Sequence, residues 1–250
     1  MQFRMHLESQ GLSGNTIRNI FKPLRLAFGY AKKKHWKESN PVNDLERGDG
    51  PTVTNAEVVI PSQAEIAKLL AEAEKEGLRE LVELGFYGLR KGEILGLTWA
   101  DFDSQASTLN VDKQWRVDSV VAETKTTASV RVVPLDPATS KRMTALRLRS
   151  KHSQDSDPII CTRNGTHLLH SNVHRSWHRI RTAAGLPDFD FHHTRHCFAS
   201  FLDAAGVPKA ERGAAGGWKN ENVPDAIYTH VTDAEKANER VREAIGAVVG

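Results

Sequence analysis

The strongest constraint on the fold is one block of β-type sequence between two long helical blocks. Residues 107–135 are rich in valine and threonine, with partial alternation of apolar and polar side chains. We expect strands at Ser107–Val117, Ser119–Thr124 and Val130–Leu135, with residues 125–129 at the tip of a hairpin. The flanking blocks have the apolar spacing of amphipathic helices. The pattern predicts an α+β fold, a mostly helical domain with a small antiparallel sheet.

A segment without helical period divides the chain. Glu46–Val59 contains two glycines and a proline, and indicates a linker. Before it, apolar side chains from Ile17 to Ala31 follow one helix face, which Pro23 interrupts. After it, Ser62 and Glu65 form a capping box. Further helices are expected at 78–87, 91–97, 138–150, 171–184, 193–205, 208–215 and 233–248. We therefore expect a helical segment at 1–45, a linker at 46–60 and the main domain at 61–250.

Charge and composition favour a polyanionic partner. The net charge is only +3, but Ser13–Lys37 has seven basic residues and no acid, and Lys141–Arg181 has nine basic residues and two acids. Two such stretches suit contact with nucleic acid, although either alone could be a solvated helix face. No apolar run reaches the ~18 residues of a membrane helix, and there are two cysteines without a CxxC pattern. These features predict a cytoplasmic protein without a membrane segment.

The segment His192–His196 reads HHTRH and allows two interpretations. His192 and His196 have the spacing of zinc ligands on a helix, but the Glu of an HExxH motif is absent. Alternatively, Arg195 grips phosphate oxygens and a neighbouring histidine accepts a proton. A second stripe of histidines at residues 170, 174 and 178 is typical of surface or core packing as well as of metal sites. The phosphate interpretation is favoured because other segments supply matching groups.

Three other segments carry those groups. In YGLRKGE, Arg90 follows a glycine at a break between helices, and Glu93 lies one turn further on. Lys125 is expected at the hairpin tip. Trp218 and Tyr228 belong to a glycine- and proline-containing stretch before the last helix. Each has an ordinary alternative: a surface ion pair, a turn lysine or a core aromatic side chain.

Taken in order, these segments resemble the tyrosine recombinase (phage integrase) family. The resemblance covers residues from about 59 to the C-terminus, and residues 13–41 are similar to the end of that family's core-binding (SAM-like) domain. The resemblance implies a DNA-clamping bundle longer than residues 1–45, so we expect this part to be incomplete. It also implies DNA cleavage and rejoining through a 3′-phosphotyrosyl intermediate, without metal, ATP or other cofactor.

The resemblance also implies residue roles. The expected catalytic set is Arg90, Lys125, His192, Arg195, Trp218 and the nucleophile Tyr228. Glu93 and His196 would support it. His193 stands where the family usually has an acidic residue, and its role is open. Basic residues of the first segment are expected to bind DNA: Arg18, Lys22, Arg25, Lys32, Lys33 and Lys34.

Several alternatives remain open from the sequence. The resemblance implies a bacterial or phage-encoded, nucleoid-associated recombinase of a mobile element, monomeric in solution and tetrameric on double-stranded DNA sites, with a directionality factor. A chromosome-dimer resolvase, a type IB topoisomerase-like enzyme and a DNA-binding remnant that no longer recombines are the competing hypotheses. The target sequence is not readable. The apolar face of the last helix, with Val241 and Ile245, suits packing on its own domain or on a neighbouring protomer.

Overall fold

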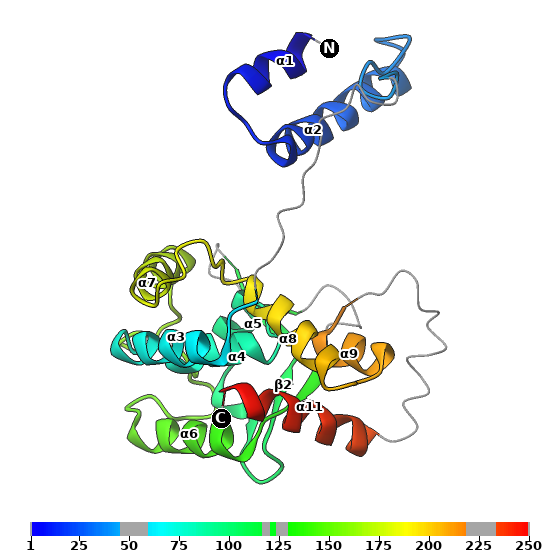
Figure 1. Ribbon diagram of the computed structural model, residues 1–250. Coiled ribbons are helices and arrows are strands. Elements are labelled where there is room, and N and C mark those ends of the chain that lie inside the picture. Colours follow the sequence, from blue (N-terminus) through cyan, green and yellow to red (C-terminus); the bar gives the residue numbers. More distant parts are fainter. Residues whose placement is uncertain (1, 46–59, 117–120, 124–129, 219–233, 250) are drawn as a thin grey trace. The chain divides into compact units, whose positions relative to one another are not determined.

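A computed structural model describes residues 2–45, 60–116, 121–123, 130–218 and 234–249 of the chain (Figure 1). The chain divides into two compact units, Met1–Glu57 and Val58–Gly250. Among the described residues, no helix has the length and apolar content needed to cross a bilayer.

The first unit is a helical pair. It contains α1 (Gln2–Ser9), which the sequence pattern did not predict, and α2 (Gly14–Lys33). Pro23 lies inside α2, and the helix continues through it. Leu7, Ile17, Phe21 and Val42 form a small buried cluster between the helices and the chain that follows. Burial of this stripe leaves the opposite face of α2 in solvent, where the basic side chains lie.

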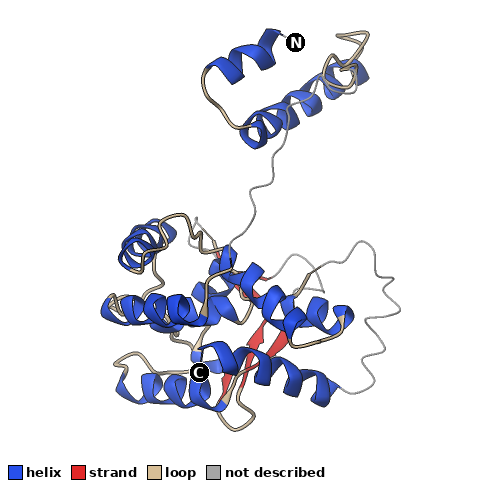
Figure 2. Ribbon diagram, in the orientation of Figure 1, coloured by secondary structure: helices blue, strands red, loops and turns tan. Residues whose placement is uncertain are grey.

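The second unit contains the expected helical blocks, shown with the strands in Figure 2. The N-terminal helices are α3 (Gln63–Lys75), α4 (Arg79–Phe86) and α5 (Lys91–Gly96), followed by a short 3₁₀ turn, η1 (Trp99–Asp101). The later helices are α6 (Pro137–Arg149), α7 (His170–Ala183), α8 (His193–Ala204), α9 (Lys209–Gly216) and α11 (Ala234–Val249). The capping box is confirmed: Ser62 Oγ accepts from the Glu65 N–H at 3.3 Å, and Glu65 Oε2 accepts from the Ser62 N–H at 2.7 Å. The prediction of a mostly helical fold is confirmed.

The β-block forms two small sheets. Strands β1 (Phe102–Asp103), β2 (Thr108–Val111) and β5 (Arg131–Pro134) pair antiparallel in the order β1-β2-β5. Strands β3 (Lys113–Trp115) and β4 (Val121–Glu123) form a separate antiparallel pair. The single strand expected at 107–117 is therefore two strands, one in each sheet. The predicted hairpin tip lies outside the described residues.

The last helix completes the core of its own unit. Helix α11 packs against β5, α8 and α6 (Figure 1). Ala237, Val241, Ile245 and Val249 are buried, one turn apart along one face. Gln63 Nε2 also donates to the Ala247 carbonyl at 3.1 Å. The structure thus places the apolar face of α11 on its own domain, the first of the two arrangements that the sequence allowed.

Candidate catalytic site

A tight turn between α4 and α5 positions Arg90. Gly88 has φ of 80°, a left-handed conformation that favours glycine. The Arg90 backbone N–H donates to Glu93 Oε2 at 2.8 Å, and Arg90 Nη1 donates to Glu93 Oε1 at 2.6 Å. The Glu93 side chain is 2% exposed and that of Arg90 is 41% exposed. Glu93 therefore holds one edge of a guanidinium that is partly exposed to solvent.

Arg195 reaches the same turn from the first turn of α8. It is 3% exposed because its neighbours on the inner face of α8 belong to the core. Its Nη1 donates to the Gly88 carbonyl, and its Nη2 donates to the Gly216 carbonyl at 2.9 Å. Arg90 Nη2 lies 3.5 Å from the Gly217 carbonyl. Two guanidinium groups from different elements thus converge between the Gly88 turn and the end of α9.

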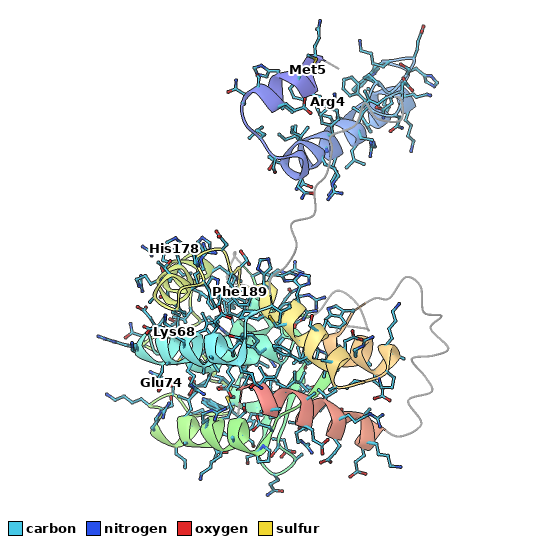
Figure 3. All side chains as sticks on the ribbon, viewed as in Figure 1. Arg4, Met5, Lys68, Glu74, His178 and Phe189 are labelled. Atoms are coloured by element: carbon cyan, nitrogen blue, oxygen red, sulfur yellow. The ribbon has the colours of Figure 1, made fainter. Side chains whose placement is uncertain are left out.

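The turn before α8 is anchored in the core. Phe189, labelled in Figure 3, is buried, with its ring centre 6.1 Å from that of Trp177. Trp177 Nε1 donates to the Phe189 carbonyl at 3.2 Å. Phe86 from α4 stacks on Phe189, with ring centres 6.5 Å apart. This packing fixes the chain three residues before His192.

The histidines at the start of α8 have different environments. His193 Nδ1 accepts from the Asp190 N–H at 3.1 Å, and Asp190 Oδ1 accepts from the His192 N–H at 2.9 Å. His193 therefore closes the turn into α8, which is a structural role. The rings of His192 and His196 lie edge to face, 5.4 Å apart, and both residues are exposed.

The surroundings of His192 favour its neutral form. Although the residue as a whole is exposed, partial desolvation of its ring lowers the pKa of His192, and the charges of Arg195, His196 and Arg90 lower it further, against an opposing effect of Asp190. A neutral imidazole has one ring nitrogen free to accept a hydrogen bond or a proton. His192 can therefore act as an acceptor at neutral pH.

The second histidine stripe lies on α7. His174 and His178 are exposed, and Figure 3 labels His178 on this helix. His170 Nε2 lies 3.0 Å from the Trp115 carbonyl oxygen, so this ring nitrogen is engaged in a hydrogen bond. Within the described ranges, no three His, Cys, Asp or Glu side chains gather as a metal site would require.

Trp218 follows α9 and lies beside Arg195. The Arg195 guanidinium carbon is 5.6 Å from its ring centre, within the range of a cation–π contact. Phe198 meets the same ring edge-on at 6.0 Å. Gly217, with φ of 61°, turns the chain between α9 and Trp218.

An open cavity of about 190 Å³ lies between the turn that joins α4 to α5 and the segment that leads into α8. Its lining combines cationic, polar and apolar side chains: Leu89, Arg90, Lys91, Asp190, Phe191, His192 and Arg195. Burial and the neighbouring charge of Arg90 lower the pKa of Arg195 to about 9, so that it remains protonated at neutral pH. The cavity can accept a small anion.

The structure does not describe two of the predicted site residues, and it contains a buried arginine near the site that the sequence analysis did not predict. Lys125 and Tyr228 lie outside the described residues. Arg131, in β5, is 8% exposed and donates through Nη2 to Glu93 Oε2 at 2.9 Å. One signal in the sequence could have indicated this burial. Arg131 occupies an inward-facing position in a strand whose first three residues alternate between buried and exposed. The six basic residues predicted to bind DNA are exposed on or just after α2, and Arg18 and Lys22 donate to Asn side chains.

Known proteins resemble this chain in sequence and in fold. A tyrosine recombinase XerC-like protein of Caldanaerobacter subterraneus subsp. tengcongensis is 28% identical over 93% of this chain and 66% of its own length. The integrase of Salmonella phage P22 is 26% identical over 62% of this chain and 39% of its own length. The chain thus spans less than two thirds of the length of these relatives. A solved structure of the Tn1549 transposon integrase, in complex with a circular intermediate DNA, matches with a TM-score of 0.77 and 20% identity, over 96% of this chain and 83% of that one.

The family comparison covers most of the second unit. The sequence profile of the phage integrase family matches residues 62–235. This segment includes both arginines of the site, His192 and Trp218. Because the match covers well over half of the chain, this protein belongs to the phage integrase family.

Proposed function

We propose that this chain is a site-specific DNA recombinase that cleaves and rejoins DNA through a covalent phosphotyrosyl link. One observation carries the proposal: Arg90 and Arg195 converge from different elements on one small cavity, beside a neutral His192. The buried carboxylate nearby, Glu93, is already paired with arginines. The cavity therefore favours an anion with several oxygen acceptors, such as a phosphodiester.

The proposed reaction is a transesterification. The Tyr228 oxygen attacks the scissile phosphorus, a new P–O bond forms to tyrosine, and the bond to the 5′-oxygen breaks. The tyrosine proton passes to His192 or water, and Lys125 supplies a proton to the leaving oxygen. Arg90 and Arg195 stabilise the negative charge that builds on the phosphoryl oxygens, and the Trp218 indole N–H is a further donor. One ester replaces another, so rejoining requires no ATP.

The proposed substrate is double-stranded DNA carrying recombination sites. The Tn1549 integrase structure contains a circular intermediate DNA, which supports the same class of ligand here. The exposed basic face of α2 would contact the phosphate backbone in a salt-dependent way. Residues 1–45 would then serve as a DNA-binding segment, and 61–250 as the catalytic domain.

The integration of a mobile element is the proposed role. Similarity to a phage integrase supports it. It also entails assembly of a homotetramer on two DNA sites and action in the cytoplasm, with a directionality factor setting integration against excision. Resolution of chromosome dimers is the second candidate, supported by similarity to a XerC-like recombinase.

The test traps the covalent intermediate. The chain is incubated in EDTA with nicked duplexes whose sequence is randomised on both sides of the nick. Cleavage close to the nick releases a short fragment that cannot rejoin, so the protein–DNA adduct accumulates. Adducts are isolated under denaturing conditions and their DNA is sequenced. Tyr228→Phe serves as the matched control, since it removes only the hydroxyl group.

Each outcome has a definite meaning. We expect adducts from the wild-type chain and none from Tyr228→Phe. Arg195→Lys should bind DNA and form adducts on the order of 100-fold more slowly, because an ammonium cannot replace the guanidinium fork. An adduct that persists in Tyr228→Phe would refute the assignment of the nucleophile. DNA binding without any adduct would refute the recombinase proposal and favour a non-cleaving remnant.

A further inference from the structure

Arg131 is a buried cation that takes no part in the reaction proposed above. It begins β5 and connects three parts of the second unit. Its Nη2 donates to Glu93 Oε2 at 2.9 Å and lies 3.5 Å from the Gly88 carbonyl, while its Nε donates to the Ala215 carbonyl at 3.0 Å. With 8% exposure, its guanidinium is not accessible to DNA.

Three arginines share the carboxyl end of α9. Each donates to one of three consecutive carbonyl oxygens: Arg131 to Ala215 at 3.0 Å, Arg195 to Gly216 at 2.9 Å and Arg90 to Gly217 at 3.5 Å. Carbonyls at a helix end lack helical partners and carry partial negative charge, which favours cations there. Of the three arginines, Arg131 is the one that does not line the cavity.

Glu93 is held from two sides. Arg90 contacts Oε1 through its guanidinium, whereas Arg131 contacts Oε2 from the buried side. Arg195 Nη1 lies further away, 4.0 Å from the same Oε2. Burial raises the pKa of Glu93, but the charge and hydrogen bond of Arg131, followed by the bonds from Arg90, bring it below its ordinary value. Removal of Arg131 would leave a buried carboxylate with less compensation, and would favour its protonation.

We propose that Arg131 is a positioning residue for the cleavage step. It holds Glu93 and the end of α9 in place at the same time, so that Arg90 and Arg195 are presented to the scissile phosphate. It also packs closely on Gly217, where an added Cβ would lie 2.9 Å from Arg131 Nη1, and so fixes the start of the chain that leads to Tyr228. This inference rests on the proposed recombinase function.

Two substitutions separate the charge of Arg131 from its geometry. Arg131→Met removes both the charge and the hydrogen-bond donors. Arg131→Lys keeps the charge beside Glu93, but a single ammonium group cannot replace the separate Nε and Nη2 donors. Arg142→Met is the matched control, because Arg142 also pairs with a buried glutamate, Glu83, away from the cavity.

The measurement is the single-turnover rate of adduct formation on the duplex that the wild-type chain enriches from the randomised pool. Equilibrium DNA binding and thermal unfolding are measured in parallel, from about pH 5 to about pH 8. We expect both Arg131 variants to slow adduct formation by about 10- to 100-fold at neutral pH with DNA binding changed less than about twofold. The rate of Arg131→Met relative to wild type should fall further toward acid pH as Glu93 becomes protonated, whereas that of Arg131→Lys should stay constant.

The outcomes separate this inference from the proposed function. Failure of the wild-type chain to form adducts refutes the recombinase proposal, and this inference with it. Wild-type adducts together with wild-type rates in Arg131→Lys refute the positioning role alone. Equal losses in Arg142→Met and the Arg131 variants, in proportion to lost stability, also refute it. Should Arg131→Met not fold, the rate and pH profile of Arg131→Lys still decide the question.

Discussion

Replacement of Gly88 by alanine tests how tightly the catalytic turn is packed against α8. Gly88 has φ of 80°, and a Cβ added there would lie 2.6 Å from Cδ1 of the buried Phe198. Its carbonyl also accepts from Arg195 and lies near Arg131. A methyl group at this position therefore strains the backbone, displaces a core ring and disturbs both arginines.

The expected loss of stability has two contributions. A non-glycine residue in the left-handed region costs about 1–2 kcal/mol. Overpacking against a buried ring adds about 1–3 kcal/mol, because Phe198 is completely buried and has little room to move. Gly88→Ala should therefore lower the free energy of unfolding by about 2–5 kcal/mol.

Gly77→Ala provides a matched control. Gly77 also has positive φ, at 68°, but a Cβ added there would have no atom within 4 Å. Urea unfolding of both variants separates the backbone cost, about 1–2 kcal/mol in each, from the packing cost, which is specific to Gly88. Equal losses in the two variants would refute the reasoning that close packing of the turn against α8 requires glycine.

Three further predictions concern charge and pH. Tyr87→Phe removes a buried hydroxyl that donates to Asp136, and should cost about 1–3 kcal/mol in urea unfolding; a loss below measurement error would contradict this. Burial raises the pKa of Asp136, but hydrogen bonds, including that from Tyr87, lower it overall. The stability that the Asp136 carboxylate contributes is thus present above its pKa in the unfolded chain, and is lost as pH falls through its pKa in the folded chain. Tyr87→Phe should make this loss of stability at acid pH smaller. The rate of adduct formation should fall at acid pH as His192 becomes protonated. His196→Asn removes one charge that lowers the pKa of His192, so in this variant the fall in rate should begin at higher pH. A fall at the same pH as in the wild type would exclude His192 as its source. Replacement of the lysines at 32–34 by glutamine should reduce the salt dependence of DNA binding by about 0.9 in log–log slope per lost phosphate contact, and an unchanged slope would show that they make none.

The sequence pattern predicted those features that depend on neighbours along the chain. The helix at Gln63–Lys75 follows from a capping box and an apolar stripe, both of which are local. The pairing of Arg90 with Glu93 follows from helical spacing and is observed at 2.6 Å. Arg195 was singled out together with His192 because the two lie in one short segment.

Features that depend on distant neighbours were predicted less well. One expected strand became β2 and β3, since β2 pairs with β5 whereas β3 pairs with β4. Both halves have strand-like composition, and composition does not specify a partner strand. Helix α1 was missed because its buried surface is a single side chain, Leu7, and its stability depends on packing against α2.

Local residue patterns are therefore sufficient for the helices of the second unit, the family and the candidate cations Arg90 and Arg195. Burial of Arg131 and its bonds to Glu93 and the Ala215 carbonyl depend on contacts between segments separated by 38 and 84 positions. An arginine in a strand is ordinarily exposed. Its burial is tolerated only when a carboxylate and free carbonyl groups from other elements pair with its guanidinium. These contacts are decided by the packed core, because periodicity along one element carries no information about which distant groups will surround a side chain.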